Sequence, residues 1–323
     1  MAILNAVDQL TALELVKRSG VDKNTKLIIE AMTQTNEILL DMPMIEANDG
    51  TVHTNLIRTS QPSGTHRTYN QGVKPSASTT TPVKDITTML ADYSVVDRDL
   101  ANNSGNKAQF ITDECVSFLN GMGIAQAEDI IYGDNGSNPA EINGFATRRK
   151  ALSAQNCFTL AGTGTDLTSV YLVACGRGLA HLIYPKGSKN CGVNREDRGL
   201  QDWDDGSGTG AKFPAYVNYF SSNYGIAVGH PKALIRLANV EGDITPDTLV
   251  DAILKYSYYL PKGVANYVLY ANVNIMQQID KATRSKANVA FTKDDPWGNP
   301  ISWIRNIRCR QVDAITQTES VIA

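Results

Sequence analysis

Residues 51–85 have the sequence TVHTNLIRTSQPSGTHRTYNQGVKPSASTTTPVKD, and this stretch decides how the rest of the chain is understood. Its β-branched residues favour extended strands, and Pro62-Ser63-Gly64 favours a turn. An isolated two-stranded arm of this kind is marginal in water because it cannot bury enough apolar surface by itself. We therefore expect the arm to be either disordered or covered by another surface. Its few apolar residues are Val52, Leu56, Ile57, Tyr69, Val73 and Val83.

The residues after the arm predict an elongated unit. Residues 86–97, ITTMLADYSVVD, are typical of a strand. Apolar residues then recur at helical spacing from Lys107 to Tyr132, with Asn106 as a start signal and Gly133 as a stop. About 26 helical residues would span roughly 39 Å, whereas the average globular helix has about 11–12 residues. Such a helix often forms the backbone of an elongated domain.

The remaining segments predict a mixture of helices and strands. Helices are expected over 5–18 and 25–42, and Pro43 should end the second. Residues 168–185, 216–229, 233–240 and 267–273 are typical of strands or buried segments, and 246–260 and 274–284 of helices. The polar, glycine-rich residues 189–214 predict a loop. The tail, 301–323, returns to strand character.

Composition and charge exclude several classes of protein. The chain has 323 residues, of which 42% are hydrophobic and 20% charged, as expected for a folded domain protein. Its formal net charge of −3 argues against a dedicated DNA-wrapping protein, which would be strongly basic. No apolar run reaches the roughly 18 residues of a membrane span, and Asp8 and Glu14 interrupt the N-terminal apolar residues, so neither a membrane segment nor a secretion signal is expected.

The sequence contains no complete catalytic, phosphate-binding or metal-binding motif. Five widely spaced cysteines without a CxxC pair favour buried thiols in a reducing compartment over a zinc site. Gly206–Lys212, GSGTGAK, resembles a phosphate loop, but Ala211 precedes the lysine and Phe213 replaces the required hydroxyl residue. The acidic run at 202–206 lacks the spacing of a calcium loop, which favours a solvated acidic loop. We expect no catalytic residue, no metal, no cofactor and no enzymatic activity.

Four segments in order resemble one known family. They are EILLDMPMIEANDG (37–50), AEDIIYGDNGSNPAEINGFATR (127–148), GIAVGHPKALIRLANV (225–240) and IRCRQVDAITQTESVI (307–322). Together with the order of arm, strand, long helix and mixed domain, they resemble the major capsid protein of tailed bacteriophages with the Hong Kong 97-type fold. Each segment alone is a weak signal, whereas four in the same order are fairly specific.

The resemblance implies an α+β fold in which each segment of the chain forms a defined part. Residues 1–50 would form the N-arm, 51–85 the extended E-loop hairpin, and 86–150 the peripheral domain with its spine helix over 107–132. Residues 151–300 would form the axial α/β domain, and 301–323 a C-terminal strand that returns to the peripheral domain. The function implied is self-assembly into the pentamers and hexamers of an icosahedral phage head that encloses double-stranded DNA.

Within this frame the arm has a hypothetical role at an assembly interface. It would lie across the spine helix and peripheral domain of a neighbouring subunit, with its basic residues facing acidic groups there. The residues assigned to this interface are Leu56, Ile57, Arg58, Arg67, Tyr69, Val73 and Lys74. A second hypothesis places the acidic loop of Asp202, Asp204, Asp205 and Gly206 at the axial pore; an ordinary surface loop is the alternative.

The implied partners are copies of the chain itself, separate scaffolding, portal and decoration proteins, and packaged DNA, which it would contact without sequence specificity. Lys17, Arg18, Lys23 and Lys26 would either face that DNA or form a solvated helix face. The implied location is the shell of the virion, after assembly in the cytoplasm of the bacterial host. Two alternatives stay open: the shell protein of a cellular nanocompartment with the same fold, and an unrecognised α/β hydrolase.

Overall fold

A computed structural model of the chain describes residues 32, 36–103, 105–153, 155–204, 206, 210–263, 266–283, 291–294 and 301–322. Its helices are α3 (Ile38–Asp41), α4 (Arg98–Asn103), α5 (Lys107–Tyr132), α6 (Phe145–Arg148), α7 (Pro246–Ser257) and α8 (Val273–Thr283), with short 3-10 turns at Asn190–Gly192 and Pro231–Ala233. Its strands are β1 (Met44–Glu46), β2 (Val52–Ser60), β3 (Thr79–Asp97), β4 (Cys157–Thr159), β5 (Leu167–Cys175), β6 (Ala180–Tyr184), β7 (Val193–Asp204), β8 (Lys212–Val228), β9 (Leu234–Glu241), β10 (Asn266–Ala271), β11 (Phe291–Asp294), β12 (Ile301–Ile304) and β13 (Ile307–Gln311).

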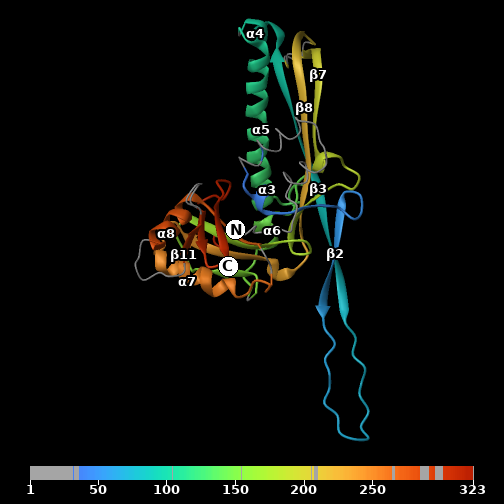
Figure 1. The fold of residues 1–323 in the computed structure, drawn as a ribbon, viewed down its shortest axis with the longest axis vertical. Helices are drawn as coiled ribbons and strands as arrows, with labels where there is room; N and C mark the ends of the chain where they lie inside the picture. Colours follow the sequence, from blue (N-terminus) through green and yellow to red (C-terminus); the bar gives the residue numbers. More distant parts are fainter. Residues whose placement is uncertain are drawn as a thin grey trace, which may run out of the picture.

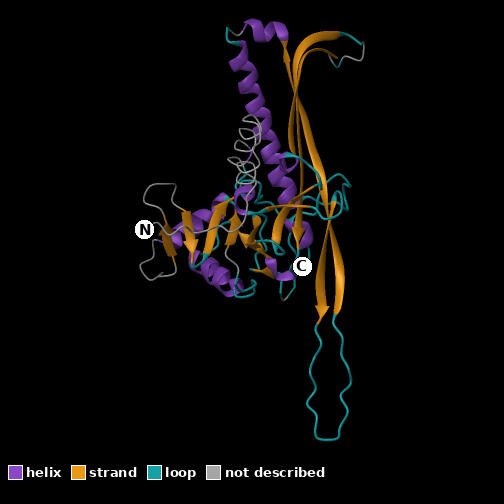
Figure 2. Ribbon diagram, turned by 45° about the vertical axis from the view of Figure 1, so that its right-hand side comes forward, coloured by secondary structure: helices purple, strands orange, loops and turns teal. Residues whose placement is uncertain are grey.

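Three parts are visible in Figure 1. A globular body contains β5, β9, β10, β13, α7 and α8. An upright stack rises beside it, built from α4, α5, β7, most of β8 and β3 from Thr87 onward. The arm, residues 51–85, projects in the opposite direction from the stack, and both views show it reaching well beyond the body (Figures 1 and 2).

One hydrogen-bonded sheet connects the three parts. Its strands follow the order β11-β12-β13-β10-β5-β6-β8-β3-β2, while β9 branches from β5 toward β4 and β7 lies along β8. The body lies at the β11 end of this path, and the arm lies at the β2 end. The link between them is β6, which pairs with β8 on one side and meets β5 through the pair Cys175↔Ala180 on the other.

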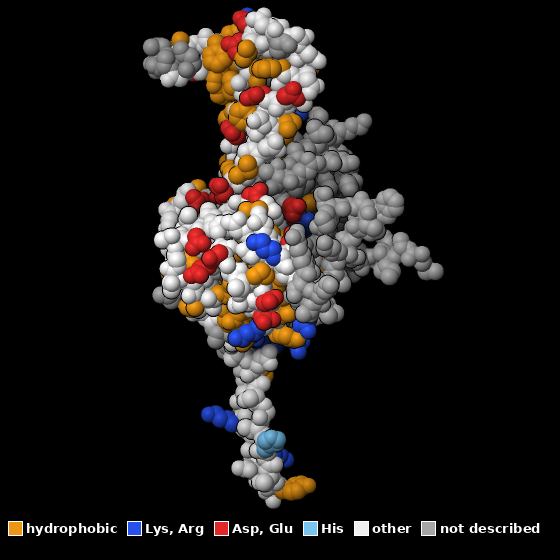
Figure 3. Space-filling model, turned by 90° about the vertical axis from the view of Figure 1, so that its left-hand side faces the viewer, with side chains coloured by type: hydrophobic (Ala, Val, Ile, Leu, Met, Phe, Trp, Pro, Cys, Tyr) orange, Lys and Arg blue, Asp and Glu red, His pale blue; other side chains and the backbone are white. Residues whose placement is uncertain are grey.

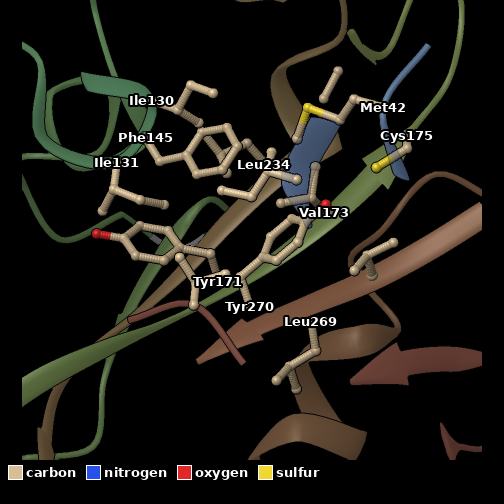
Figure 4. Close-up of a cluster of buried hydrophobic side chains, with 14 of the residues drawn as sticks. Met42, Ile130, Ile131, Phe145, Tyr171, Val173, Cys175, Leu234, Leu269 and Tyr270 are labelled. Atoms are coloured by element: carbon tan, nitrogen blue, oxygen red, sulfur yellow. The ribbon is translucent and has the colours of Figure 1, made fainter. Parts of the chain in front are cut away.

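The core of the body surrounds β5, in which every residue is buried. Figure 4 shows Phe145 between Tyr171 of β5 and Tyr270 of β10, with isoleucines of α5 beside them. The ring centroids of Phe145 and Tyr171 are 5.6 Å apart, within the range of favourable aromatic pairs. Strands buried on both faces contain nearly continuous apolar runs, which explains the predicted buried segment over 168–185.

The long helix begins and ends where the sequence predicts. Asn106 caps the start of α5 by accepting a hydrogen bond from the backbone N–H of Gln109 at 3.3 Å. At its other end, the N–H of Gly133 bonds to the carbonyl of Asp129, and a Cβ at Gly133 would lie 2.5 Å from that oxygen. Only glycine fits this stop. None of the described helices, α5 included, is long and apolar enough to cross a membrane.

Strand β3 is longer than its predicted segment. It begins at Thr79 rather than at residue 86 and runs without a break to Asp97. Its first part pairs with β2 in the arm, and its second part pairs with β8 in the stack from Thr87↔Gly225 to Asp97↔Ala215. The polar composition of residues 79–82 hides this continuity, because their side chains are exposed while their backbone is paired.

The predicted loop over 189–214 is wrong for most of its length. Residues 193–204 form β7, and β8 begins at Lys212; the two pair from Val193↔Ser222 to Asp204↔Lys212. β7 is a polar strand with no apolar alternation, and the backbone ladder to β8 rather than side-chain burial holds it in place. The region expected to form one axial domain is therefore divided, since 193–222 lies in the stack.

The C-terminal strand belongs to the body. β13 lies parallel to β10, with Leu269 opposite Cys309, whereas the sequence predicted its return to the peripheral domain. The physical reason is burial: Ile307 and Cys309 alternate into the core beneath the sheet. Only the tail beyond it approaches the stack, at Tyr132 in the last turn of α5. The predicted helices over 246–260 and 274–284 are confirmed as α7 and α8.

A buried polar network fixes that tail. Arg236 of β9 and Glu319 form an ion pair at 2.7 Å, with side chains only 6% and 7% exposed. Tyr132 donates to the other carboxylate oxygen of Glu319 at 2.7 Å, and Ser169 of β5 also donates to Glu319. Burial, followed by the nearby Glu319 charge, raises the pKa of Tyr132, which keeps its hydroxyl a donor. The network thus joins tail, body and α5.

The five cysteines are buried and unpaired with one another. Burial raises the pKa of Cys191 to about 11 and that of Cys309 to about 12, which keeps these thiols protonated at neutral pH. The prediction of buried thiols is confirmed. The two N-terminal helices expected from sequence lie largely outside the described residues; α3 is the described end of the second and stops before Pro43.

Candidate assembly interface

The arm is a hairpin that the rest of its own chain leaves uncovered. Its ladder runs from Val52↔Ile86 to Ser60↔Thr79, with an irregularity between Arg58 and Ser60. Beyond Ser60 the two limbs separate and continue to a rounded tip (Figure 2). Every residue from 58 to 82 is exposed. The free-standing arm that the composition of residues 51–85 predicts is therefore present, with no contact that buries it.

Hydroxyl groups strengthen the end of the ladder. The side chain of Thr79 bonds to those of Thr59 and Ser60 at 2.9 and 2.8 Å. These contacts are exposed and each contributes little, but together they hold the strands at the point where regular pairing stops. They explain why Thr and Ser are frequent in a segment without a core.

The tip has a local structure of its own. Residues 68–71 form a turn in which the N–H of Gln71 bonds to the carbonyl of Thr68 at 3.3 Å, and the side chains of the same two residues bond at 3.1 Å. Asn70 has a φ of +65°, a left-handed conformation that asparagine tolerates better than most residues. Tyr69 is 98% exposed at this turn. The turn therefore presents an aromatic ring to solvent.

The seven residues assigned to the interface have different exposures. Leu56 is 71% exposed and Val73 is 52% exposed, while Ile57 is half-buried. Arg58, Arg67 and Lys74 are exposed, and no ion pair joins them to a described carboxylate of the same chain; Arg67 bonds only to the carbonyl of Gln71. Each assigned residue except Ile57 is thus available to a second molecule.

The arm also differs in charge from the rest of the molecule. It carries four basic residues, and no acidic residue occurs between Thr51 and Lys84. Its last residue is Asp85, and the remainder of the chain then holds 26 Lys and Arg against 32 Asp and Glu. Figure 3 shows basic side chains on the arm and acidic ones spread over the stack and body above it. This asymmetry favours contact between the arm of one copy and the surface of another.

Buried polar groups hold the base of the arm. Asp85 of β3 is buried and pairs with Arg148 of α6 at 2.7 Å, and its other oxygen accepts the N–H of Val228. On the other strand, the side chain of Asn48 makes two 2.8 Å bonds to the backbone of Thr54. A rigid base therefore supports an uncovered arm.

The stack offers an uncovered aromatic face that sequence reasoning missed. Tyr93 of β3 lies against Tyr219 of β8, with centroids 4.8 Å apart, and against Trp203 of β7 at 5.4 Å. The guanidinium of Arg198 sits over both tyrosine rings. Ser94, next to Tyr93, is buried and within 3.9 Å of Cys115 of α5, so the aromatic group occupies the sheet face opposite α5. The alternation was visible, but its partner β7 was predicted as loop.

The predicted spine helix carries acidic and apolar groups on its outer side. Asp113, Glu114 and Glu128 are exposed along α5, as are the apolar Val116 and Ile124. Such a mixture suits a basic arm with a few apolar side chains. It is the arrangement that the interface hypothesis requires on the receiving subunit.

The acidic loop lies far from the body. Asp202 and Asp204 are exposed at the free end of the β7–β8 hairpin, level with α4 (Figure 1), and Gly206 follows in the turn. Asp205 lies outside the described residues. The hypothesis placed this loop on the axial domain, whereas the hairpin carries it to the far end of the stack. The reason is the unpredicted pairing of β7 with β8.

No group of three or more His, Cys, Asp or Glu side chains in the described ranges could hold a metal ion. The arrangement described above offers surfaces for contact between molecules.

The chain resembles a known protein family and several solved shell proteins. The family model described as major capsid protein GP7 matches residues 20–323. A solved chain of bacteriophage Epsilon15 is 27% identical, with a TM-score of 0.66, and the match covers 87% of this chain and 88% of that one. The capsid of bacteriophage JBD30 matches at 9% identity and a TM-score of 0.47, over 93% and 97% of the two chains. The SrpI encapsulin of Synechococcus elongatus PCC 7942 matches at 11% identity and 0.42, over 70% and 94%. No curated protein sequence matches the chain.

Proposed function

The chain belongs to the family of major capsid protein GP7, and from that premise we propose that it assembles with copies of itself into the pentamers and hexamers of an icosahedral phage head around double-stranded DNA. Its role would be structural rather than enzymatic. The observation that carries the proposal is the arm: residues 58–82 are exposed in the single subunit, although they hold a regular ladder and an ordered tip.

A second copy would supply the missing cover. Arm and receiving surface are different parts of the chain, so the contact is heterologous, and heterologous contacts close into rings when the rotation permits. The receiving surface would be the outer side of α5 on the neighbour, which carries Asp113, Glu114 and Glu128. The apolar residues Leu56, Tyr69 and Val73 would bury area there, while Arg58, Arg67 and Lys74 would set the register against its acidic groups.

No single contact need be strong. A standard interface buries about 1,600 Å² in total, and each subunit of a ring shares at least two. A shell held by many moderate contacts is stable as a whole, while a wrongly placed subunit can still dissociate. The acidic balance outside the arm suits this scheme, because it leaves any contact with packaged DNA weak and unspecific.

The proposal extends to partners and place of assembly. We infer separate scaffolding, portal and decoration proteins, and assembly in the cytoplasm of the bacterial host before the shell becomes part of the virion. Purified particles with and without co-expressed phage proteins would test which of these partners assembly needs.

Size-exclusion chromatography with negative-stain microscopy tests the function itself. We expect the purified chain to elute as pentamers and hexamers or as hollow icosahedral particles. A small monomer that turns over a hydrolysable ester would instead support the hydrolase alternative. Particles that hold an enzyme rather than DNA when isolated from their natural host would support the nanocompartment.

Reversing the charge of the arm should slow assembly. In the variant Arg58→Glu/Arg67→Glu/Lys74→Glu we expect the rate of particle formation, followed by light scattering, to fall about tenfold or more at low ionic strength. The difference from the wild type should narrow in roughly 1 M salt, where the Debye length is about 3 Å. The matched control Arg58→Lys/Arg67→Lys keeps the charge and should assemble at nearly the wild-type rate. Equal rates for all three proteins would contradict the charge contribution.

A further inference from the structure

Two histidines meet where the arm joins the molecule. His53 of β2 and His181 of β6 lie with their ring centroids 5.2 Å apart and their planes at 83°, an edge-to-face contact. His181 is 1% exposed, and His53 is half-buried. The other two histidines of the chain differ: His66 is exposed in the arm, and His230 accepts a hydrogen bond from the backbone of Lys232.

The ring nitrogens at this contact have few hydrogen-bond partners. Neither ring nitrogen of His181 makes a hydrogen bond of normal geometry, although the backbone of Leu179 lies close enough to favour its protonated form slightly. The Nδ1 atom of His53 is also buried without a partner. Buried polar groups without partners are uncommon in folded proteins, and each one asks for an explanation.

The charges around the two rings do not stabilise a proton on them. Asp85 stands directly opposite His53 in the β2–β3 pair, but its carboxylate already pairs with Arg148 and with the N–H of Val228. Arg177, in the turn before β6, repels a positive charge on His181. Opposite His181 on β8 stands the uncharged Ala227. A proton on His181 would thus meet a second imidazole and the cation of Arg177, while the carboxylate opposite His53 is already paired with Arg148.

We propose that the His53–His181 contact is a pH-sensitive latch that fixes the arm at neutral pH and releases its base when His181 becomes protonated. The latch sits between β2, which belongs to the arm, and β6, which links stack and body. Opening it would free the arm to change direction without unfolding the body. The latch is a property of the single subunit, and only its use in shells rests on the proposed function.

The direction of the effect follows from linkage. Burial first, and then His53, lower the pKa of His181 to about 4, below the ordinary value of 6.5. The closed form therefore binds fewer protons than the open form, and its advantage is complete above pH 6.5 and lost as the pH falls toward 4. Between neutral pH and pH 5 these two values predict a roughly 20- to 30-fold rise in the opening equilibrium.

Hydrogen exchange on the unassembled full-length subunit tests the latch. After correction for intrinsic rates, we expect amides of residues 51–56 and 84–88 to exchange roughly 20 times faster at pH 5 than at pH 7, while those of β5 stay unchanged. The variant His53→Phe/His181→Phe keeps two rings that cannot be protonated and should lose this pH dependence. The control His66→Gln, in the exposed part of the arm, should keep it.

Two outcomes would overturn the proposal. One is equal protection of the arm base at pH 7 and pH 5 in the wild type. The other is an unchanged pH dependence in the double phenylalanine variant. Should that variant fail to fold, the wild-type imidazole signals decide by NMR titration: a His181 that titrates near its ordinary pKa without faster exchange at the arm base excludes a latch. Either negative result leaves shell assembly by the arm untouched.

Discussion

Deletion of residues 55–80 will yield a soluble, folded subunit that forms no shells. Of the deleted residues only Asn55 and Ile57 are half-buried and the others are exposed, so the free energy of unfolding should change by no more than about 1 kcal/mol. The deletion keeps the pairs Val52↔Ile86, His53↔Asp85 and Thr54↔Lys84, and residues 81–83 remain to close the shortened hairpin as a three-residue loop. If each contact between subunits loses about 3 kcal/mol of binding free energy, its dissociation constant rises about 100-fold.

Electron microscopy and sedimentation measure the outcome. Wild type and deletion variant are compared at equal concentration, with urea unfolding to show that the body is intact. The matched control replaces residues 61–67 with a Gly-Ser linker of the same length and keeps the tip turn with Tyr69. It therefore distinguishes the effect of the arm's length from the effect of its side-chain contacts. Normal particles from the deletion variant would refute the role of the arm.

The second large effect concerns stability. We expect Glu319→Ala to lower the free energy of unfolding by about 3–5 kcal/mol, because it leaves Arg236 charged and buried without its partner. Tyr132 and Ser169 lose an acceptor at the same time. Urea unfolding of the unassembled subunit, followed by tryptophan fluorescence, measures the change.

Two further variants test whether the buried, unpaired charge causes the loss of stability. Asp99→Ala breaks an ion pair with Arg98 that is largely exposed, and should cost no more than about 0.5 kcal/mol. The double variant Arg236→Met/Glu319→Leu removes both charges and should be more stable than Glu319→Ala alone. A loss below about 1 kcal/mol in Glu319→Ala would show that the network does not anchor the tail.

Local signals in the sequence predicted much of the fold. The boundaries of α5 follow from a cap at Asn106 and a stop at Gly133, which act within one helical turn, and both lie where the sequence placed them. The helices over 246–260 and 274–284 and the buried strand around Val170 follow from apolar periodicity. The α+β class and the resemblance to phage major capsid proteins are confirmed as well.

Non-local pairing explains what was missed. Nothing between Val193 and Asp204 alternates in polarity, so only the backbone ladder to β8 reveals a strand, and that ladder joins residues far apart in sequence. The place of the acidic loop at the end of this hairpin could not be predicted for the same reason. The network around Glu319 joins Tyr132, Ser169 and Arg236, which no spacing rule connects.

The candidate interface was half predictable. A polar, β-branched segment without a core implies an uncovered arm, and its residues could be named from composition alone. The aromatic face of the stack could not be predicted, because Tyr93, Trp203 and Tyr219 meet only when three strands come together. The side chains of a single exposed segment can be predicted from the sequence. A surface formed by several elements can be identified only once the fold is known.

The unbroken course of β3 from arm to stack has a mechanical consequence. A pull on the arm acts along the axis of this strand, so the load falls in shear on its whole row of bonds to β8, from Thr87↔Gly225 to Asp97↔Ala215, rather than peeling them apart one at a time. Many bonds must then yield together. Tension applied to the arm would therefore be carried along the stack through β3 and β8.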